Sequence, residues 1–214
     1  MNTKQNKIKN KKNQSPQKKP NQKVDNNNIS KCYWLALAGV FIITLIIYFK
    51  ATGFGYVWDD DLYIIQNSHI KNIKWENIKL FFTEFYAGNY QPITILTYAV
   101  EQKLFKDPSV FLHINNIIIH IINTYLVFVL IKKISPKNAV VALITAAFFA
   151  VHPMHVESVA WISERKDVLY SLFFLLSLIV YCNYLKTQNI KLLIYAAVFF
   201  ILSCLSKSAA VVLP

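Results

Sequence analysis

Three short clusters of ionisable residues stand out in this sequence because long apolar blocks separate them. The clusters are Trp58-Asp59-Asp60-Asp61, then His152–Glu157 with Arg165-Lys166-Asp167, then Ser206-Lys207. Ionisable groups at membrane depth are costly, so they mark a functional site by default. If the three clusters lie on the same side of a membrane, they can build one site.

The first cluster offers consecutive carboxylates just beyond an apolar block. A carboxylate partly removed from water is a better base, which makes Asp59 and Asp60 candidates for general-base catalysis. Asp61 is a candidate supporting group. The same acids can also ligate a metal ion, and a solvated loop without a catalytic role is the alternative.

The second cluster places two imidazoles close to a carboxylate. His152, His155 and Glu157 are predicted to hold a divalent ion such as Mg²⁺ or Mn²⁺, since imidazole and carboxylate together suit such ions. The His-x-x-His spacing is weak evidence by itself. A helix cap or an interfacial pair of hydrogen-bonded side chains is the alternative.

Three cations near the same boundary predict a phosphate site. Arg165 is the only arginine in the chain, and its planar guanidinium suits a phosphate or a carboxylate. Lys166 follows it, Asp167 is a supporting acid, and Lys207 can pair with a lipid phosphate. Interfacial anchoring of these side chains is the alternative.

A polar stripe runs through one apolar block. His113, Asn116, His120 and Asn123 are spaced three, four and three residues apart, which places them on one face of a helix. Polar groups in a membrane helix face the interior of the bundle, so the stripe is predicted to form hydrogen bonds between helices. His113 is nearest the outer face and best placed to reach the site.

The composition favours a membrane protein. The 214 residues are 55% hydrophobic and only 16% charged, a combination that is rare in soluble domains of this size. We expect an all-α fold, a polytopic bundle of transmembrane helices with spans at about residues 32–49, 110–131, 139–151, 168–185 and 190–205. The third block is short for a bilayer, so a re-entrant segment is the alternative unless it extends to about Trp161.

The charge distribution orients the predicted spans. Residues 1–31 carry nine lysines and one acid, and they are predicted to form a disordered, basic, cytoplasmic tail. With five crossings, residues 51–109, 152–167 and 206–214 lie outside, together with all three ionisable clusters. Nucleic acid is not an expected partner, because no aromatic and basic binding module follows the tail.

The first outer loop, residues 51–109, is large enough to hold structure of its own. Ile73, Ile78 and Phe81-Phe82 predict a short amphipathic helix lying at the membrane interface. A small folded loop without lipid contact is the alternative.

The stretch Tyr56–Ile64 resembles the first outer-loop motif of a glycosyltransferase family with many spans. His152–Asp167 resembles a second, longer and more specific motif, and Leu205-Ser206-Lys207 with Ala210–Pro214 resembles a third. The family is the transmembrane and tetratricopeptide-repeat O-mannosyltransferase-like proteins of the GT-C type. The resemblance covers about residues 50–214.

This resemblance implies transfer of a mannose-like sugar, with inversion, from a polyprenyl-phosphate donor to a hydroxyl of a protein or glycan acceptor. It also implies that a first-loop acid is the base, and this role falls on Asp59 first and then Asp60. Glycosyl transfer needs a carboxylate near the acceptor and cations near the leaving phosphate, which agrees with the residues present. Membrane lipids are expected partners, and a bacterial inner (plasma) membrane is the expected location.

Two features depart from the family pattern. Ser208 follows Lys207 where relatives usually have proline, which affects the expected helix geometry more than the role of the lysine. Relatives also continue into more spans and a repeat domain, so residues 32–214 are expected to form an incomplete transferase domain. A transporter or channel whose path follows the polar stripe is an alternative function, and a non-catalytic membrane scaffold is another.

Overall fold

The computed structural model describes residues 26–105 and 108–213, and the fold of these residues is all-α. Five helices contain the five predicted apolar blocks. They are α1 (Asn26–Phe49), α4 (Ser109–Ile134), α5 (Ala139–Val151), α7 (Arg165–Thr187) and α8 (Ile190–Ser206). The predicted tail falls mainly on residues 1–25, which lie outside the described residues, and α1 already begins at Asn26.

Within the part of the chain that the structure describes, three helices are long and apolar enough to cross a membrane. They are the stretches Lys31–Gly53, Ser109–Ile134 and Ile162–Thr187. At 1.5 Å per residue, the second of these reaches about 39 Å, which exceeds the roughly 30 Å of a bilayer's hydrocarbon core. The chain is therefore a membrane protein with a helical bundle.

The third apolar block is a bent pair of helices. Helix α5 ends at Val151, and a 3₁₀ turn (Pro153–His155) leads into the short helix α6 (Val156–Ala160). Pro153 lacks an N–H group and cannot continue the helix, so the axis turns by 51° at this break. The pair counts as a fourth candidate span only if both pieces are taken together, as the sequence predicted for an extension to about Trp161.

The first outer loop folds around its own apolar core. It contains the short helical turns Lys50–Gly53, Asp61–Ile65 and Ser68–Lys71, followed by α2 (Trp75–Thr83) and α3 (Pro92–Leu104). Tyr63, Ile70, Phe81, Ile95 and Tyr98 are fully buried together. The predicted amphipathic helix is α2. Helix α3 was not predicted, and it packs between this core and the transmembrane helices.

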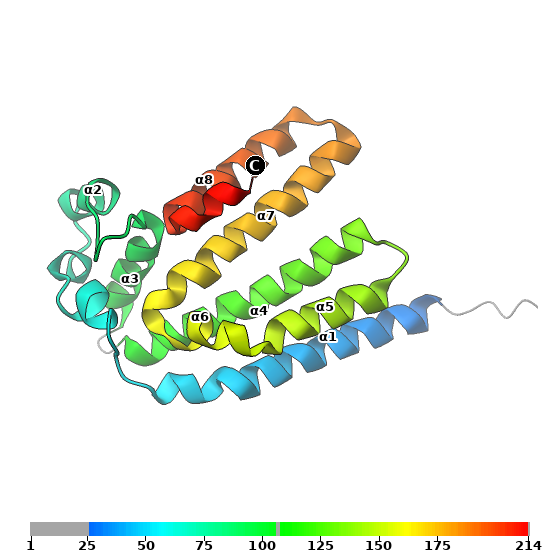
Figure 1. Ribbon diagram of the computed structural model, residues 1–214, viewed down its shortest axis with the longest axis horizontal. Helices are drawn as coiled ribbons and strands as arrows, with labels where there is room; N and C mark the ends of the chain where they lie inside the picture. The colour runs from blue at the N-terminus through cyan, green and yellow to red at the C-terminus, as the bar shows by residue number, and fades with distance from the viewer. Residues whose placement is uncertain (1–25, 106–107, 214) are drawn as a thin grey trace, which may run out of the picture.

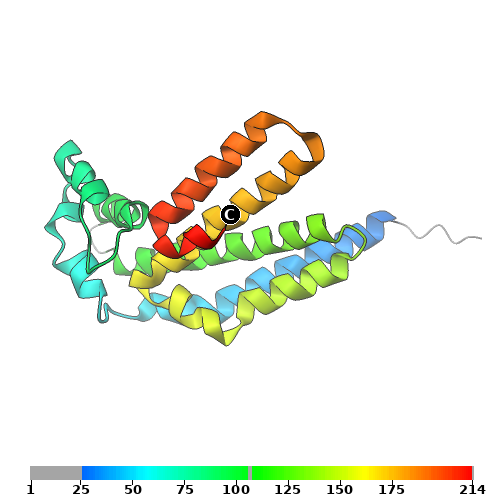
Figure 2. The same ribbon diagram turned by 45° about the horizontal axis from the view of Figure 1, so that its top comes forward.

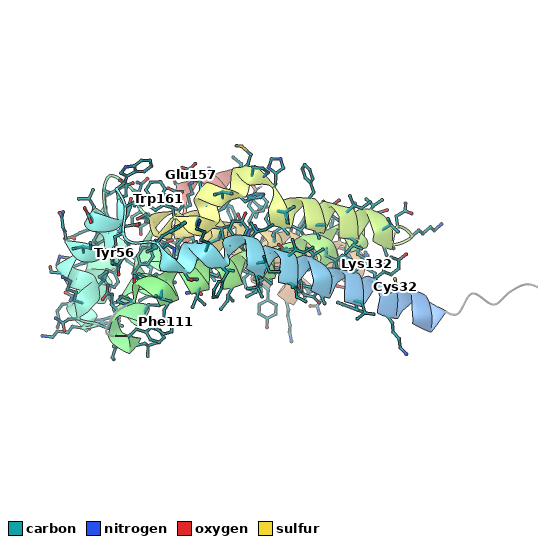
Figure 3. All side chains as sticks on the ribbon, turned by 90° about the horizontal axis from the view of Figure 1, so that it is seen from below. Cys32, Tyr56, Phe111, Lys132, Glu157 and Trp161 are labelled. Carbon is teal, nitrogen blue, oxygen red and sulfur yellow. The ribbon has the colours of Figure 1, made fainter. Side chains whose placement is uncertain are left out.

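The loops of the bundle separate into two ends. Figures 1 and 2 show the start of α1, the α4–α5 loop and the α7–α8 loop at one end, and α2, α3, α6 and the end of α8 toward the other. In Figure 3, Cys32 and Lys132 lie at the first end, whereas Tyr56 and Trp161 lie at the second. All three ionisable clusters therefore belong to segments at the second end.

Side chains of the polar stripe on α4 form hydrogen bonds with backbone carbonyl groups of neighbouring segments. Asn116 Nδ2 donates to the Trp161 carbonyl at 3.0 Å, and Asn123 Nδ2 donates to the Val168 carbonyl at 2.8 Å. His120 Nε2 lies 3.0 Å from the carbonyl oxygen of Ala150. The prediction of hydrogen bonding between helices is confirmed for these three residues. These contacts give the stripe a structural role between helices.

Candidate active site

Asp60 joins the first cluster to the second. Its side chain is fully buried. Oδ2 accepts a hydrogen bond from the Val57 N–H at 2.9 Å, while Oδ1 accepts from the Ser163 N–H at 2.8 Å and from the Ser163 hydroxyl. This carboxylate therefore fixes the first outer loop against the 3₁₀ turn Ile162–Glu164 that precedes α7.

Lys207 joins the third cluster to the second. Its Nζ donates to Asp167 Oδ1 and lies 3.9 Å from Glu164 Oε2, and Lys166 Nζ contacts the other oxygen of Glu164 at 2.7 Å. We call these four side chains the α7–α8 charge cluster. Burial lowers the pKa of Lys207, but the hydrogen bond and charge of Asp167, with Glu164, outweigh burial and raise the pKa above its ordinary value. Lys207 is thus a permanent cation at neutral pH.

These contacts assemble the three clusters at one end of the molecule. A further buried hydrogen bond, from Thr94 Oγ1 to the Ser206 carbonyl at 3.1 Å, ties the end of α8 to α3. Tyr98, also on α3, donates from its Oη to the Ile162 carbonyl at 2.9 Å, and this bond joins α3 to the turn before α7. Helix α3, which the sequence did not reveal, is therefore the element that holds the site together.

Asp59 differs from Asp60 in its burial and in its hydrogen bonds. It is half-buried, and its carboxylate has no hydrogen bond or ion pair with any residue in the described ranges. The preceding residue, Trp58, has φ of +47°, a left-handed conformation that is strained for a bulky side chain. Contacts of Trp161 stabilise this turn, because the two indole rings lie 5.3 Å apart and Trp161 Nε1 donates to the Val57 carbonyl at 3.3 Å. Asp59 therefore follows a strained residue that contacts of Trp161 hold in place.

A cleft of about 510 Å³ lies between the first loop and α6. Asp60, His113, Glu157 and Trp161 line it, together with the loop residues Gly53, Phe54, Gly55 and Val57. Figure 3 shows Tyr56, Glu157 and Trp161 gathered at this end of the molecule. The lining contains carboxylates and no lysine or arginine, so the cleft suits a neutral or cationic group better than a phosphate. His113 reaches the site, as its position on α4 predicted.

Arg165 is not placed as the sequence predicted. Its guanidinium is fully buried and donates five hydrogen bonds, which account for all five of its N–H donors. Two of them form a bidentate pair with Glu101, at 2.7 and 3.1 Å. The remaining acceptors are Thr97, Asn116 and the Leu112 carbonyl. This residue therefore holds α3, α4 and α7 together and has no donor left for a phosphate.

The proposed metal ligands are not gathered into one group. His152 Nδ1 accepts from the Met154 N–H at 3.2 Å, which is the helix-cap alternative. The His155 ring packs on Phe149, with centroids 4.5 Å apart, whereas Glu157 lines the cleft. Within residues 26–105 and 108–213, no three His, Cys, Asp or Glu side chains form a group that could hold a metal. The predicted ligand set therefore does not fit a divalent ion.

Two residues that organise the site were not singled out from the sequence. Glu101 carries no motif signal, and only its contact with Arg165 reveals its role. Ser163 lies within the second motif, but its bond to Asp60 spans more than a hundred residues and has no local signature. Asp61, the last residue of the first cluster, is exposed at the start of the helical turn Asp61–Ile65.

Comparison with known proteins now identifies the family. A model described as dolichyl-phosphate-mannose-protein mannosyltransferase matches residues 92–214, which is more than half of the chain. The chain belongs to this family. It is a glycosyltransferase family, and the matched residues include the second and third ionisable clusters. No solved structure matches the chain.

Several proteins similar to this chain are named protein O-mannosyl-transferases. Protein O-mannosyl-transferase Tmtc1 of Drosophila melanogaster is 24% identical over 82% of this chain and 21% of its own length. Protein O-mannosyl-transferase F38B6.6 of Caenorhabditis elegans is 30% identical over 77% of this chain and 25% of its own length. Protein O-mannosyl-transferase TMTC1 of Homo sapiens is 39% identical over 44% of this chain and 10% of its own length. The chain thus spans a quarter or less of the length of these relatives.

Proposed function

We propose that this chain carries the active site of an inverting membrane glycosyltransferase. The enzyme moves a mannose-like sugar from a polyprenyl-phosphate donor to a hydroxyl of a protein acceptor, on the outer face of the membrane. The main support is the meeting of the three clusters through the Asp60–Ser163 and Lys207–Asp167 hydrogen bonds. Family membership supports the same chemistry, and the names of the relatives support a protein acceptor.

Asp59 is the base in this proposal. The acceptor oxygen forms a bond to the anomeric carbon of the sugar as the bond from that carbon to the phosphate oxygen breaks. The hydroxyl proton passes to the Asp59 carboxylate, and polyprenyl phosphate leaves with the bonding electrons. The Asp60 carboxylate is a positioning group, because its oxygens already accept three hydrogen bonds.

The lysines of the α7–α8 charge cluster stabilise the leaving group. Negative charge grows on the phosphate as the sugar takes on oxocarbenium character, and fixed cations lower the energy of that state. Lys207 has the more accessible side chain, 31% exposed against 10% for Lys166. Lys207 is therefore the principal phosphate ligand, and Lys166 supports it.

Replacing Lys207 tests this assignment. In proteoliposomes containing the full-length protein, polyprenyl-phosphate mannose and a mixture of Ser- and Thr-containing peptides, the wild type is expected to release polyprenyl phosphate. Lys207→Gln is expected to lower kcat/KM about 100-fold, the usual scale for losing one group that stabilises developing charge. Mass spectrometry of the lipid follows the reaction. Lys186→Gln, at the exposed far end of α7, is the control.

The conservative variant separates charge from packing. Lys207→Arg keeps the cation and is expected to retain most of the activity. If Lys207→Gln turns over donor as fast as the wild type, the phosphate assignment is wrong. If the wild type releases no polyprenyl phosphate from any hexose donor, the glycosyltransferase proposal itself fails.

The outer-face location is tested by labelling. In a variant without Cys32, Cys182 and Cys204, a single cysteine replaces either Ser68 in the first loop or Lys137 in the α4–α5 loop. Both positions are exposed. A membrane-impermeant maleimide is expected to label Ser68→Cys in intact cells and Lys137→Cys only after permeabilisation. The opposite pattern would place the active site on the cytoplasmic face.

A further inference from the structure

A second, smaller pocket lies beside the α7–α8 charge cluster. It has a volume of about 150 Å³ and lies among α4, α5, the turn into α6, and α7. Most of the residues that line it are polar, although the surrounding helices are strongly apolar. These polar residues are His120, Asn123, His155, Ser158, Asp167, Tyr170 and Ser171. A polar pocket in such a bundle needs a polar occupant.

Several polar groups of this pocket have capacity left for a ligand. Asn123 is fully buried, and its Oδ1 has no hydrogen-bond partner among the described residues, although its Nδ2 is bonded. The His155 imidazole and the Ser171 hydroxyl also form no hydrogen bond within that part of the chain. An unpartnered buried amide oxygen is costly, which indicates that something outside the chain donates a hydrogen bond to it.

The charges of the lining residues indicate which kind of ligand the pocket can bind. Asp167 is the only carboxylate in the lining, and Lys207 pairs with its Oδ1 while the Ser158 hydroxyl donates to its Oδ2 at 3.2 Å. A cation therefore finds a carboxylate that is already neutralised. An anion meets that carboxylate and the Asn123 oxygen, which both repel it. A neutral molecule with several hydroxyl groups, each able to donate and accept, matches the free groups best.

The position of the pocket connects it to the donor phosphate. Lys207, the proposed phosphate ligand, bonds to the pocket residue Asp167 and lies 6.0 Å from the ring centroid of Tyr170, another pocket residue. A group attached to a phosphate on Lys207 would therefore lie at the pocket. The volume equals that of about five water molecules at about 30 Å³ each, which is enough for one sugar ring and not for a longer glycan.

We propose that this pocket holds the sugar ring of the lipid-linked donor, with Asn123, His155 and Ser171 as the residues that select it. The inference rests on the proposed glycosyl transfer and goes beyond it by assigning where the sugar is recognised. It makes the pocket, rather than the acidic cleft at Asp60, the determinant of which monosaccharide is transferred.

Filling the pocket tests the inference. Ser171→Leu introduces a larger side chain without removing a hydrogen bond between described residues. Ser171→Ala is the matched control, because it also removes the hydroxyl but leaves the space open. Binding of polyprenyl phosphate and of polyprenyl-phosphate mannose to the full-length protein is compared in detergent. The wild type is expected to bind the mannosylated lipid about ten-fold more tightly than the bare lipid, since one or two hydrogen bonds supply that difference. Ser171→Leu is expected to reduce the ratio to about one without changing the affinity for the bare lipid.

The outcomes separate this inference from the proposed function. If the wild type binds and turns over the donor but Ser171→Leu keeps the ten-fold ratio, the pocket holds only water and the inference is wrong. If the wild type binds neither lipid, the proposed function fails and the inference fails with it. Should Ser171→Leu not fold, a donor with a photoreactive group on its sugar tests the wild type directly. Crosslinks to peptides of α4 and α7 support the pocket, and crosslinks confined to residues 53–61 overturn it.

Discussion

Asp59→Asn is expected to reduce sugar transfer by about 10²- to 10⁴-fold while leaving the fold intact. Asparagine keeps the size and polarity of the side chain but cannot take the acceptor's proton, and loss of a general base has effects of this size. The side chain has no partner in the described ranges, so no structural contact is lost with the charge. Release of polyprenyl phosphate by the purified full-length protein measures the rate, and tryptophan fluorescence measures the folded fraction.

Neighbouring acids provide matched controls for this result. Asp61→Asn changes another aspartate, which is exposed and lies two positions away, and it is expected to retain the wild-type rate. Asp60→Asn places an N–H donor where the carboxylate now accepts hydrogen bonds, so it is expected to lower both activity and melting temperature. Unchanged turnover in Asp59→Asn, or an equal loss in Asp61→Asn, would remove Asp59 as the base.

The helices of the bundle were predictable because their signal is local. Each apolar block is long enough to be recognised without knowledge of its neighbours, and each lies within one observed helix. The short third block raised a re-entrant segment or an extension to about Trp161, but the break at His152-Pro153 was not predicted. Helix α3 was missed because Pro92–Leu104 mixes apolar residues with Glu101 and Lys103, and its burial depends on contacts with distant segments.

The meeting of the three clusters was predictable, but the roles of individual residues were not. The spacing of the clusters and the positive-inside rule brought the right segments together, and the contacts Asp60–Ser163 and Lys207–Asp167 agree with that convergence. The role of Arg165 could not be predicted, since it depends on a carboxylate 64 residues away. A lone arginine at a membrane boundary has the same local pattern whether it meets a phosphate or a buried glutamate.

Glu101→Leu is expected to destabilise the protein by about 3–5 kcal/mol, because the buried guanidinium of Arg165 loses the carboxylate that balances its charge. Leucine is close to glutamate in size, so the loss measures the uncompensated charge rather than a large cavity. The arginine also bonds to Asn116 and the Leu112 carbonyl, and its displacement would loosen the start of α7. The α7–α8 charge cluster includes Glu164 and Lys166, the residues on either side of Arg165, so donor use is expected to fall together with stability.

Chemical denaturation in detergent micelles, followed by tryptophan fluorescence, measures this change in the free energy of unfolding. Glu76→Leu makes the same substitution at an exposed position of α2 and is expected to change stability by less than about 0.5 kcal/mol. The double variant Glu101→Leu with Arg165→Leu removes both charges and is expected to recover part of the loss, since the two residues contact each other directly. If Glu101→Leu is as stable as Glu76→Leu, the buried pair does not hold α3 to α7. The packing of α3 against α8, through Thr94 and Ser206, would then have to position the site without it.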